Sequence, residues 1–156
     1  MARRHTYKTS VFWAGDRGEG TQGYRSYSRE FDISCNGKPV IKGSADPNYM
    51  GDASRHNPED LLLASLSSCH MLWYLHLCAA SKVVVIAYED HAEGVMEVGP
   101  DGSGQFVSAT LRPRVVISPH SDVVRAERLH EKANALCFVA RSVNFPVEHE
   151  PEILTG

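Results

Sequence analysis

The stretch NPEDLLLASLSSCHMLWYLHLCAAS, residues 57–81, decides how the rest of this chain must fold. It opens with a complete helix start: Asn57 can cap the helix, Pro58 suits its first position, and two carboxylates follow near the positive end of the helix dipole. Between Asp60 and Lys82 there is no Asp, Glu, Lys or Arg, and apolar side chains cover nearly every face. A helix that is apolar all round must be enclosed, so we expect a long central helix buried on all sides.

This stretch is close to the ~20 apolar residues that a bilayer requires. Its serines and histidines are scattered along its length, however, and each would need a partner inside lipid. We therefore expect the buried helix of a soluble, cytoplasmic protein with no membrane contact. The first ten residues carry basic side chains without an apolar run behind them, which is not the pattern of a signal peptide.

Length and charge exclude several classes of protein. A chain of 156 residues predicts one domain, residues 1–156. Lys and Arg total 16 against 19 Asp and Glu, a formal charge of -3, so no basic excess favours nucleic acid as a partner. The four cysteines are too few for a disulfide-rich secreted scaffold and have no CxxC or metal-ligand spacing.

The segments around the helix predict strands. Residues 6–13 and 24–34 are expected to form two strands, and the Asn36-Gly37 turn leads into a short third strand over 40–42. Residues 83–98 and 106–117 predict a further hairpin, which Pro113 restricts to an edge or a bulge. A second helix follows Asp122, and residues 145–153 form an extended tail. This order indicates an α+β fold with antiparallel sheets packed on the central helix.

The four thiols are not equivalent. Cys69 lies in the middle of the helix, where a cysteine is commonly a small core hydrophobe. Cys78 is nine residues further on, on the opposite face and ~13.5 Å along the axis, so it cannot pair with Cys69 within an intact helix. Cys35 lies beside the hairpin turn and has no assigned role. Tertiary packing could bring Cys137 to Cys69, although spacing alone does not show it.

At this point the sequence resembles a known family. The segments Asn57–Leu62 and Leu66–Met71 resemble the signature of the OsmC/Ohr family of thiol peroxidases, in which an Asn-Pro-Glu helix start precedes the reactive cysteine by the same interval. The similarity extends over essentially the whole chain, through residues 13–16, 20–21 and 135–137. Many relatives have proline after the second cysteine, whereas Phe138 follows it here, so the chain resembles a divergent branch.

The resemblance implies a peroxiredoxin-like enzyme that reduces organic hydroperoxides and hydrogen peroxide in oxidative stress defence, without metal, flavin or haem. Cys69 would attack the peroxide as a thiolate and become a sulfenic acid. Cys137 would resolve this acid to a Cys69–Cys137 disulfide, which an external dithiol, in some members a lipoylated protein, reduces.

The thiolate needs a cation, because burial raises the pKa of a thiol. In the family an N-terminal arginine, oriented by the glutamate of the helix start, supplies it, and Glu59 matches that glutamate. The ordinary alternative for Glu59 is a carboxylate that stabilises the helix dipole. For the arginine we favour Arg29, on the apolar face of the expected second strand, and Arg17 and Arg55 stay open as candidates.

The geometry of the helix predicts that two copies of the chain form each active site. Glu59 and Cys69 are ten residues apart, or ~15 Å along a straight helix, so one helix cannot place both in one site. Two antiparallel central helices could, which agrees with the intertwined dimer of the family. We expect an obligate homodimer with active sites at its interface.

An apolar lining is expected to favour a bulky organic hydroperoxide. The residues expected to form it are Leu66, Met71, Trp73 and Phe138. His70 and His76 lie on different helix faces and are read as non-ligands. The competing interpretations are a non-catalytic dimeric binding protein, which would use the interface pocket for an apolar ligand, and a redox-sensing thiol protein.

Overall fold

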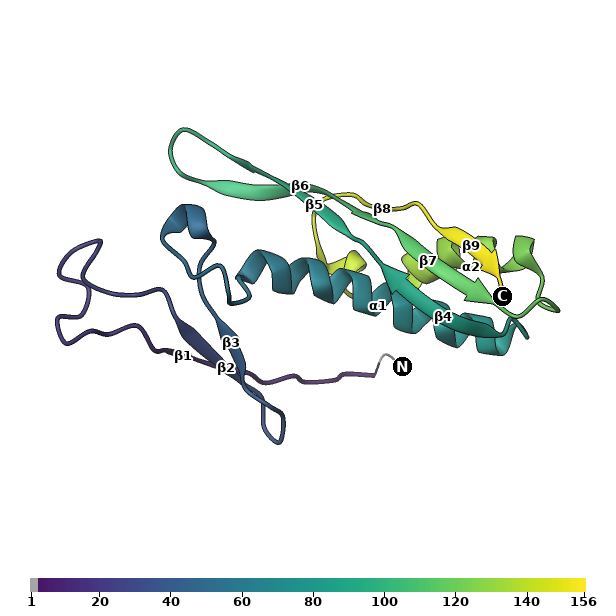
Figure 1. The fold of residues 1–156 in the computed structure, drawn as a ribbon, viewed down its shortest axis with the longest axis horizontal. Helices are drawn as coiled ribbons and strands as arrows, with labels where there is room; N and C mark the ends of the chain where they lie inside the picture. Colours follow the sequence, from purple (N-terminus) through teal and green to yellow (C-terminus); the bar gives the residue numbers. More distant parts are fainter. Residues whose placement is uncertain (1–2) are drawn as a thin grey trace. The chain divides into compact units, whose positions relative to one another are not determined.

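The computed structural model describes residues 3–156, which form two compact units that divide between Leu61 and Leu62 (Figure 1). In the first unit, β1 (Ser10–Trp13), β2 (Phe31–Ser34) and β3 (Ile41–Gly43) form an antiparallel sheet in that order. A short 3-10 helix, η1 (Pro47–Tyr49), follows, and α1 (Pro58–Ala80) begins at the end of this unit.

The strand predictions for this unit are partly right. The hairpin turn at Asn36-Gly37 is confirmed: Gly37 has a φ of 73°, and the Lys38 N–H donates to the Cys35 carbonyl at 3.0 Å. The second strand begins only at Phe31, however, and the preceding residues fold into turns. Arg29 therefore lies before the strand and not on its apolar face.

The second unit contains most of α1, six strands and a second helix. In chain order they are β4 (Val85–Asp90), β5 (Glu93–Val98), β6 (Gly104–Leu111), β7 (Pro113–Ile117), α2 (Val123–Leu136), the 3-10 helix η2 (Ala140–Ser142), β8 (Val147–His149) and β9 (Glu152–Thr155). The strands form two sheets, ordered β4-β7-β9 and β5-β6-β8. The predicted cap of α2 is confirmed, because the Asp122 carboxylate accepts from the Arg125 N–H at 3.0 Å.

The prediction of antiparallel sheets is wrong for the end of the chain. The pairs β4–β7 and β5–β6 are antiparallel, but β8 runs parallel to β6, and β9 runs parallel to β7. Parallel strands need a long crossover, and the segment that contains α2 provides it. The expected tail over 145–153 is thus two short strands that complete both sheets (Figure 1).

Pro113 also differs from its prediction. It is the first residue of β7, which is the central strand of its sheet and not an edge. A proline is tolerated at the start of a strand because the missing N–H is not needed there. Only Arg112 separates β6 from β7. The antiparallel pairs β5–β6 and β4–β7 therefore follow one another as one long ribbon, which is interrupted at this residue.

One stripe of α1 forms the centre of the second unit. Its buried residues recur every three or four positions: Leu66, His70, Tyr74, Leu77 and Cys78. The C-terminal part of this stripe, which begins at Tyr74, packs in one cluster. Its neighbours there are Val115 and Ile117 of β7 and Ala126 and Leu129 of α2. This is the contact pattern of an amphipathic helix on a sheet.

Several side chains of α1 outside this stripe are exposed in the part of the chain that the structure describes. Leu72, for example, is 63% exposed. Within residues 3–156, α1 is the helix that is long and apolar enough to cross a bilayer by length and composition, a criterion that core helices of soluble proteins also meet. The buried His70 and Tyr74 are polar residues that pack in a protein core here.

The Asp90 carboxylate links α1 to the ribbon at Arg112. Its Oδ1 accepts the Arg112 N–H at 2.7 Å, and its Oδ2 accepts the Ser67 hydroxyl of α1. A charged acceptor with two donors makes a stronger contact than a neutral hydrogen bond. Because Ser67 lies two residues before Cys69, this contact also fixes the part of α1 that carries the thiol.

Candidate active site

Cys69 is placed by the start of α1 and by its packing. At the helix start, the Asn57 side-chain oxygen accepts the Asp60 N–H at 2.7 Å, and the Asp60 carboxylate accepts the Asn57 N–H at 3.3 Å. This reciprocal cap confirms the predicted helix start. Cys69 lies three turns further on, half-buried and with a free thiol.

Cys137 lies at the C-terminal end of α2, next to Cys69. It is the cap residue of the helix and is buried, and its thiol is close enough to Cys69 for that residue to affect its pKa. Burial, with a smaller contribution from the neighbouring Cys69, raises the pKa of the Cys137 thiol to about 11, although the Ala140 N–H, which donates to its sulfur at 3.4 Å, acts in the opposite direction. Cys137 is therefore a neutral thiol at pH 7.

The other two cysteines are elsewhere. Cys78 is buried beside the Tyr74 hydroxyl, and burial raises the pKa of its thiol. Cys35 is half-buried in the first unit. The structure therefore brings together the two cysteines that the sequence analysis paired, and it leaves the other two thiols as buried or loop residues.

Glu59 and Arg29 line one pocket of the first unit. The pocket has a volume of about 380 Å³, and its aromatic walls are Trp13, Tyr27, Phe31 and Tyr49. The Oε2 atom of Glu59 is buried and has no hydrogen-bond partner among residues 3–156. A carboxylate oxygen without a partner is costly to bury, so this atom is available to a group that enters the pocket.

Arg29 is held rigidly at this pocket. Its guanidinium donates to the carbonyl oxygens of Tyr27 at 2.8 Å and Tyr24 at 2.7 Å, and it lies 4.2 Å and 4.4 Å from the centres of their rings. Cation–π contact and two carbonyl acceptors fix the orientation of the group but leave its positive charge without a carboxylate partner among the ion pairs of the described chain.

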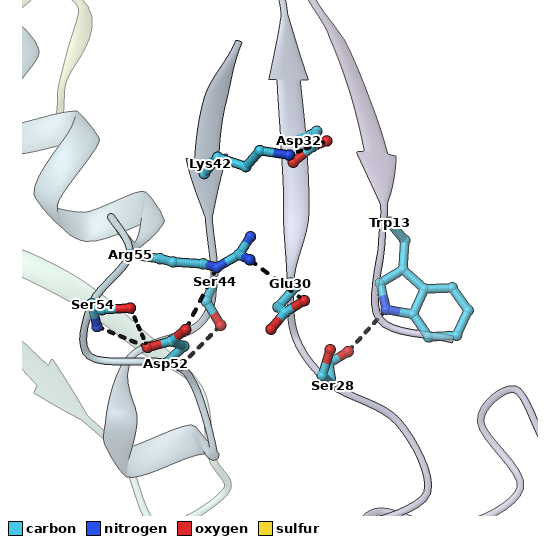
Figure 2. A network of polar contacts seen from close by, with 9 residues as sticks. All are labelled: Trp13, Ser28, Glu30, Asp32, Lys42, Ser44, Asp52, Ser54 and Arg55. Carbon is cyan, nitrogen blue, oxygen red and sulfur yellow. Dashed lines mark hydrogen bonds and ion pairs between the residues drawn. The ribbon is translucent and has the colours of Figure 1, made fainter. Parts of the chain in front are cut away.

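The other two arginine candidates have different surroundings. Arg55 is bound to two carboxylates, with Glu30 Oε2 at 3.6 Å from its Nη2 and Asp52 Oδ2 at 3.5 Å from its Nε (Figure 2). Arg17 lies exposed in the glycine loop. Of the three, Arg29 is the one that shares a pocket with Glu59.

The predicted apolar lining divides between core and surface. Leu66 is part of the core. Trp73 meets the exposed Phe138 edge to face, with ring centres 5.4 Å apart, and lines a cavity of about 230 Å³ together with Leu72 and His76. Trp73 lies on α1, which carries Cys69, and Phe138 directly follows Cys137, so an apolar surface does lie beside the two thiols.

A cluster of histidines that the sequence did not predict is buried in the second unit. His70 of α1 and His130 of α2 are both 0% exposed, and His70 Nε2 lies 2.9 Å from His130 Nδ1. The Tyr74 ring stacks on His130 at 3.8 Å, and the half-buried His149 of β8 lies 5.6 Å from His70, measured between ring centres. The sequence holds no local signal for this position, because a helix that is apolar on every side has no preferred face.

This cluster is not a metal centre. No group of three or more His, Cys, Asp or Glu in the described part of the chain has the geometry to hold a metal ion. Burial lowers the pKa of His70 to about 4 and that of His130 to about 3, and the charge of neighbouring histidines contributes in the same direction. Both rings are therefore neutral near pH 7.

Two mixed three-stranded sheets, a long thiol-bearing helix and a second helix that ends at a second thiol define the OsmC-like α+β fold. The chain belongs to the family of OsmC-like proteins, whose sequence pattern matches residues 51–152. It is similar to an OsmC-like protein of unknown function from Vibrio cholerae, with 30% identity and a TM-score of 0.86 over 96% of this chain and 100% of that one.

Other relatives are more distant. The uncharacterized protein YmaD of Bacillus subtilis is 25% identical over 72% of this chain and 77% of its own length. An organic hydroperoxide resistance protein from Elizabethkingia anophelis shares the fold at a TM-score of 0.70, with 16% identity and full coverage of both chains. The recognition of the OsmC/Ohr family is thus confirmed.

The buried histidines predict how stability depends on pH. An unfolded histidine binds its proton near pH 6.5, whereas His70 and His130 resist protonation down to about pH 4 and 3, so acid favours the unfolded chain. We expect the free energy of unfolding to fall as the pH drops from 6.5 towards 5, by up to about 1.4 kcal/mol per pH unit for each histidine. Urea titrations at pH 7.5, 6.5 and 5.5 measure this.

The control is the double variant His70→Leu/His130→Leu, in which the slope between pH 6.5 and 5 should be clearly smaller. Carboxylates with lowered pKa, such as Asp16, Asp52 and Asp101, affect stability only at more acidic pH. Equal slopes in the wild type and the double variant would contradict the prediction.

Proposed function

We propose that this protein is a cytoplasmic, thiol-dependent peroxidase that reduces organic hydroperoxides, with Cys69 as the attacking thiolate and Cys137 as the resolving thiol. The observation that carries the proposal is the pairing of these two thiols from separate helices, with Cys137 kept neutral by burial. Structural neighbours that are organic hydroperoxide resistance proteins support the same substrate class.

The first step takes place at Cys69. Its thiolate attacks the terminal oxygen of the hydroperoxide, the O–O bond breaks, and the alkoxide leaves as the alcohol after taking a proton from water. Cys69 is then a sulfenic acid. An aromatic pocket with a fixed arginine suits this step, because the guanidinium stabilises the negative charge that moves from sulfur to the leaving oxygen.

The second step uses Cys137. Its sulfur attacks the sulfur of the sulfenic acid, the S–O bond breaks, and the hydroxyl leaves as water with the proton of the Cys137 thiol. A neutral, buried Cys137 does not compete for the peroxide, because the thiolate is the nucleophilic form. An external dithiol, for example a lipoylated protein, returns the disulfide to two thiols.

Separating the two steps tests the roles of the cysteines. Cys69→Ser should abolish consumption of cumene hydroperoxide, because no nucleophile remains. Cys137→Ser should consume about one equivalent per chain and then stop, with a sulfenic acid at Cys69 that dimedone traps. Mass mapping of the wild type under non-reducing conditions should show the Cys69–Cys137 disulfide.

Cys78→Ser serves as the matched control and should turn over like the wild type. Unchanged turnover in Cys69→Ser would reject the peroxidase. Rapid oxidation to a stable disulfide without turnover would favour the redox-sensing interpretation, and an inert Cys69 would favour the binding protein.

A second test concerns the arginine. Arg29→Met should lower kcat/KM for cumene hydroperoxide by about a hundredfold, because a fixed positive charge at the reacting atoms is lost. The thiolate absorbance of Cys69 in the ultraviolet at pH 7 should fall in the same variant. Arg17→Met is the control and should leave both quantities unchanged. If Arg17→Met has the large effect and Arg29→Met does not, the assignment is wrong.

We also propose that the working unit is a homodimer. The faces of α1 that a single chain leaves open carry apolar residues such as Leu72 and Leu75, and a second chain would remove them from water. In this arrangement Glu59 acts together with Cys69 of the partner subunit. The ~15 Å between Glu59 and Cys69 along one helix then does not prevent the two residues from sharing a site. The apolar contact makes the dimer obligate.

Light scattering coupled to size exclusion measures the assembly. We expect a mass twice the 17.2 kDa of one chain. Leu72→Glu, which places a charge on the open face of α1, should shift the protein towards monomer and lower turnover, whereas Val124→Glu on the exposed face of α2 should do neither. A fully active monomer would contradict the proposed dimer.

A further inference from the structure

Most of the buried polar atoms that lack a partner lie in one region of the second unit. Within the described chain they include His70 Nδ1, His130 Nε2, Asn134 Oδ1 and the Tyr88 hydroxyl. Such atoms are rare in a well-packed core because each costs free energy. A protein that retains them at one place has a use for the polar groups there.

The His70–His130 contact depends on a single proton. The two rings are nearly coplanar, with 8° between them, and they meet through His70 Nε2 and His130 Nδ1 at 2.9 Å. One of these nitrogens must carry the proton and the other must accept it. Each ring is neutral because burial lowers its pKa, so the bond is not broken by protonation near pH 7.

The surroundings of the pair contain few charges. Tyr74 of α1 covers one face of His130, and Tyr88 of β4 lies 6.0 Å from Tyr74 between ring centres. His149 of β8 lies beside both histidines, and Glu131 of α2 acts on His149. No carboxylate pairs directly with either buried ring among the ion pairs of residues 3–156.

Two pairs of residues thus connect α1 and α2. His70 follows Cys69 on α1, and α2 carries His130 and ends at Cys137 seven residues later, which is two helical turns or ~10.5 Å. His70 contacts His130, and the Cys137 thiol at the end of α2 is close enough to Cys69 to be affected by it. The hydrogen bond is directional, whereas the leucine and alanine contacts of the core permit small shifts of one helix along the other.

We propose that His70 and His130 are positioning residues for the thiol pair: their hydrogen bond holds α1 and α2 in the register at which the Cys137 thiol reaches Cys69. The inference rests on the proposed function for its role in catalysis, but not for its geometry. In this proposal the two histidines act when the Cys69–Cys137 disulfide closes. The attack of Cys69 on the peroxide does not depend on it.

The test compares disulfide closure in His130→Leu and His130→Asn. Leucine removes the bonding nitrogen, whereas asparagine keeps a polar atom one bond beyond Cγ, where Nδ1 lies. After one equivalent of cumene hydroperoxide, closure of Cys69–Cys137 should be about ten- to a hundredfold slower in His130→Leu, because small misplacements of reacting groups are costly. His130→Asn should recover closure to within about threefold of the wild type.

Two further readouts separate positioning from general loss of structure. The rate at which Cys69 becomes oxidised should be the same in His130→Leu and the wild type. Leu129→Ala, which weakens the packing of α2 at the neighbouring core position, should leave closure close to the wild-type rate. If His130→Leu does not fold, His70→Leu/His130→Leu replaces it, because that variant leaves no unpaired ring nitrogen.

Diamide provides an oxidant that does not depend on peroxidase activity. Cys69 adds to its N=N bond, Cys137 displaces the adduct, and the products are the disulfide and a hydrazine. If the wild type closes with diamide but ignores the hydroperoxide, the proposed function fails, and the variants still test the positioning.

Three results would overturn the inference: wild-type closure in His130→Leu with either oxidant, equal slowing in His130→Leu, His130→Asn and Leu129→Ala, or no Cys69–Cys137 disulfide in the wild type with both oxidants.

Discussion

The second unit depends on the burial of one stripe of α1 against β7 and α2. Leu66 and Leu77 each contribute about 1.5–3 kcal/mol when they are removed from water, and Leu77 packs in one core with residues of β7 and α2. Once this stripe is fixed, Cys69 must lie beside the end of α2. Core packing therefore brings the two thiols to the same region of the second unit.

The same stripe contains polar residues that a simpler core would not have. His70 and Tyr74 occupy positions where leucine would pack equally well, and their burial carries a cost in solvation. The cost is offset where the rings bond and stack, as His70 does with His130 and Tyr74 with the same ring. A directional contact of this kind restricts the two helices to one register, which apolar packing alone specifies less sharply.

The first unit holds an arginine and a glutamate at one aromatic pocket. Arg29 is oriented by two tyrosines and two carbonyl groups before any ligand arrives, and Glu59 presents an unpaired oxygen to the same pocket. Preorganised charge of this kind stabilises a transition state without reorganisation during the reaction. Arg55, by contrast, already forms ion pairs with Glu30 and Asp52 (Figure 2). Its charge therefore stabilises the loop that precedes α1.

The sequence by itself determined the local features: both helices, the cap of Asn57 on Asp60, the cap of Asp122, the turn at Asn36-Gly37 and the family. These depend on neighbouring residues, whose side chains meet the backbone within a few positions. Only the tertiary structure decided which stripe of α1 is buried, because a helix that is apolar on every side has no preferred face in its sequence. It also decided the parallel pairing of β8 and β9, the position of Arg29 outside its expected strand, and the meeting of His70 with His130, sixty residues away. Each of these contacts joins segments that local patterns cannot relate, since they are set by the packing of the whole unit.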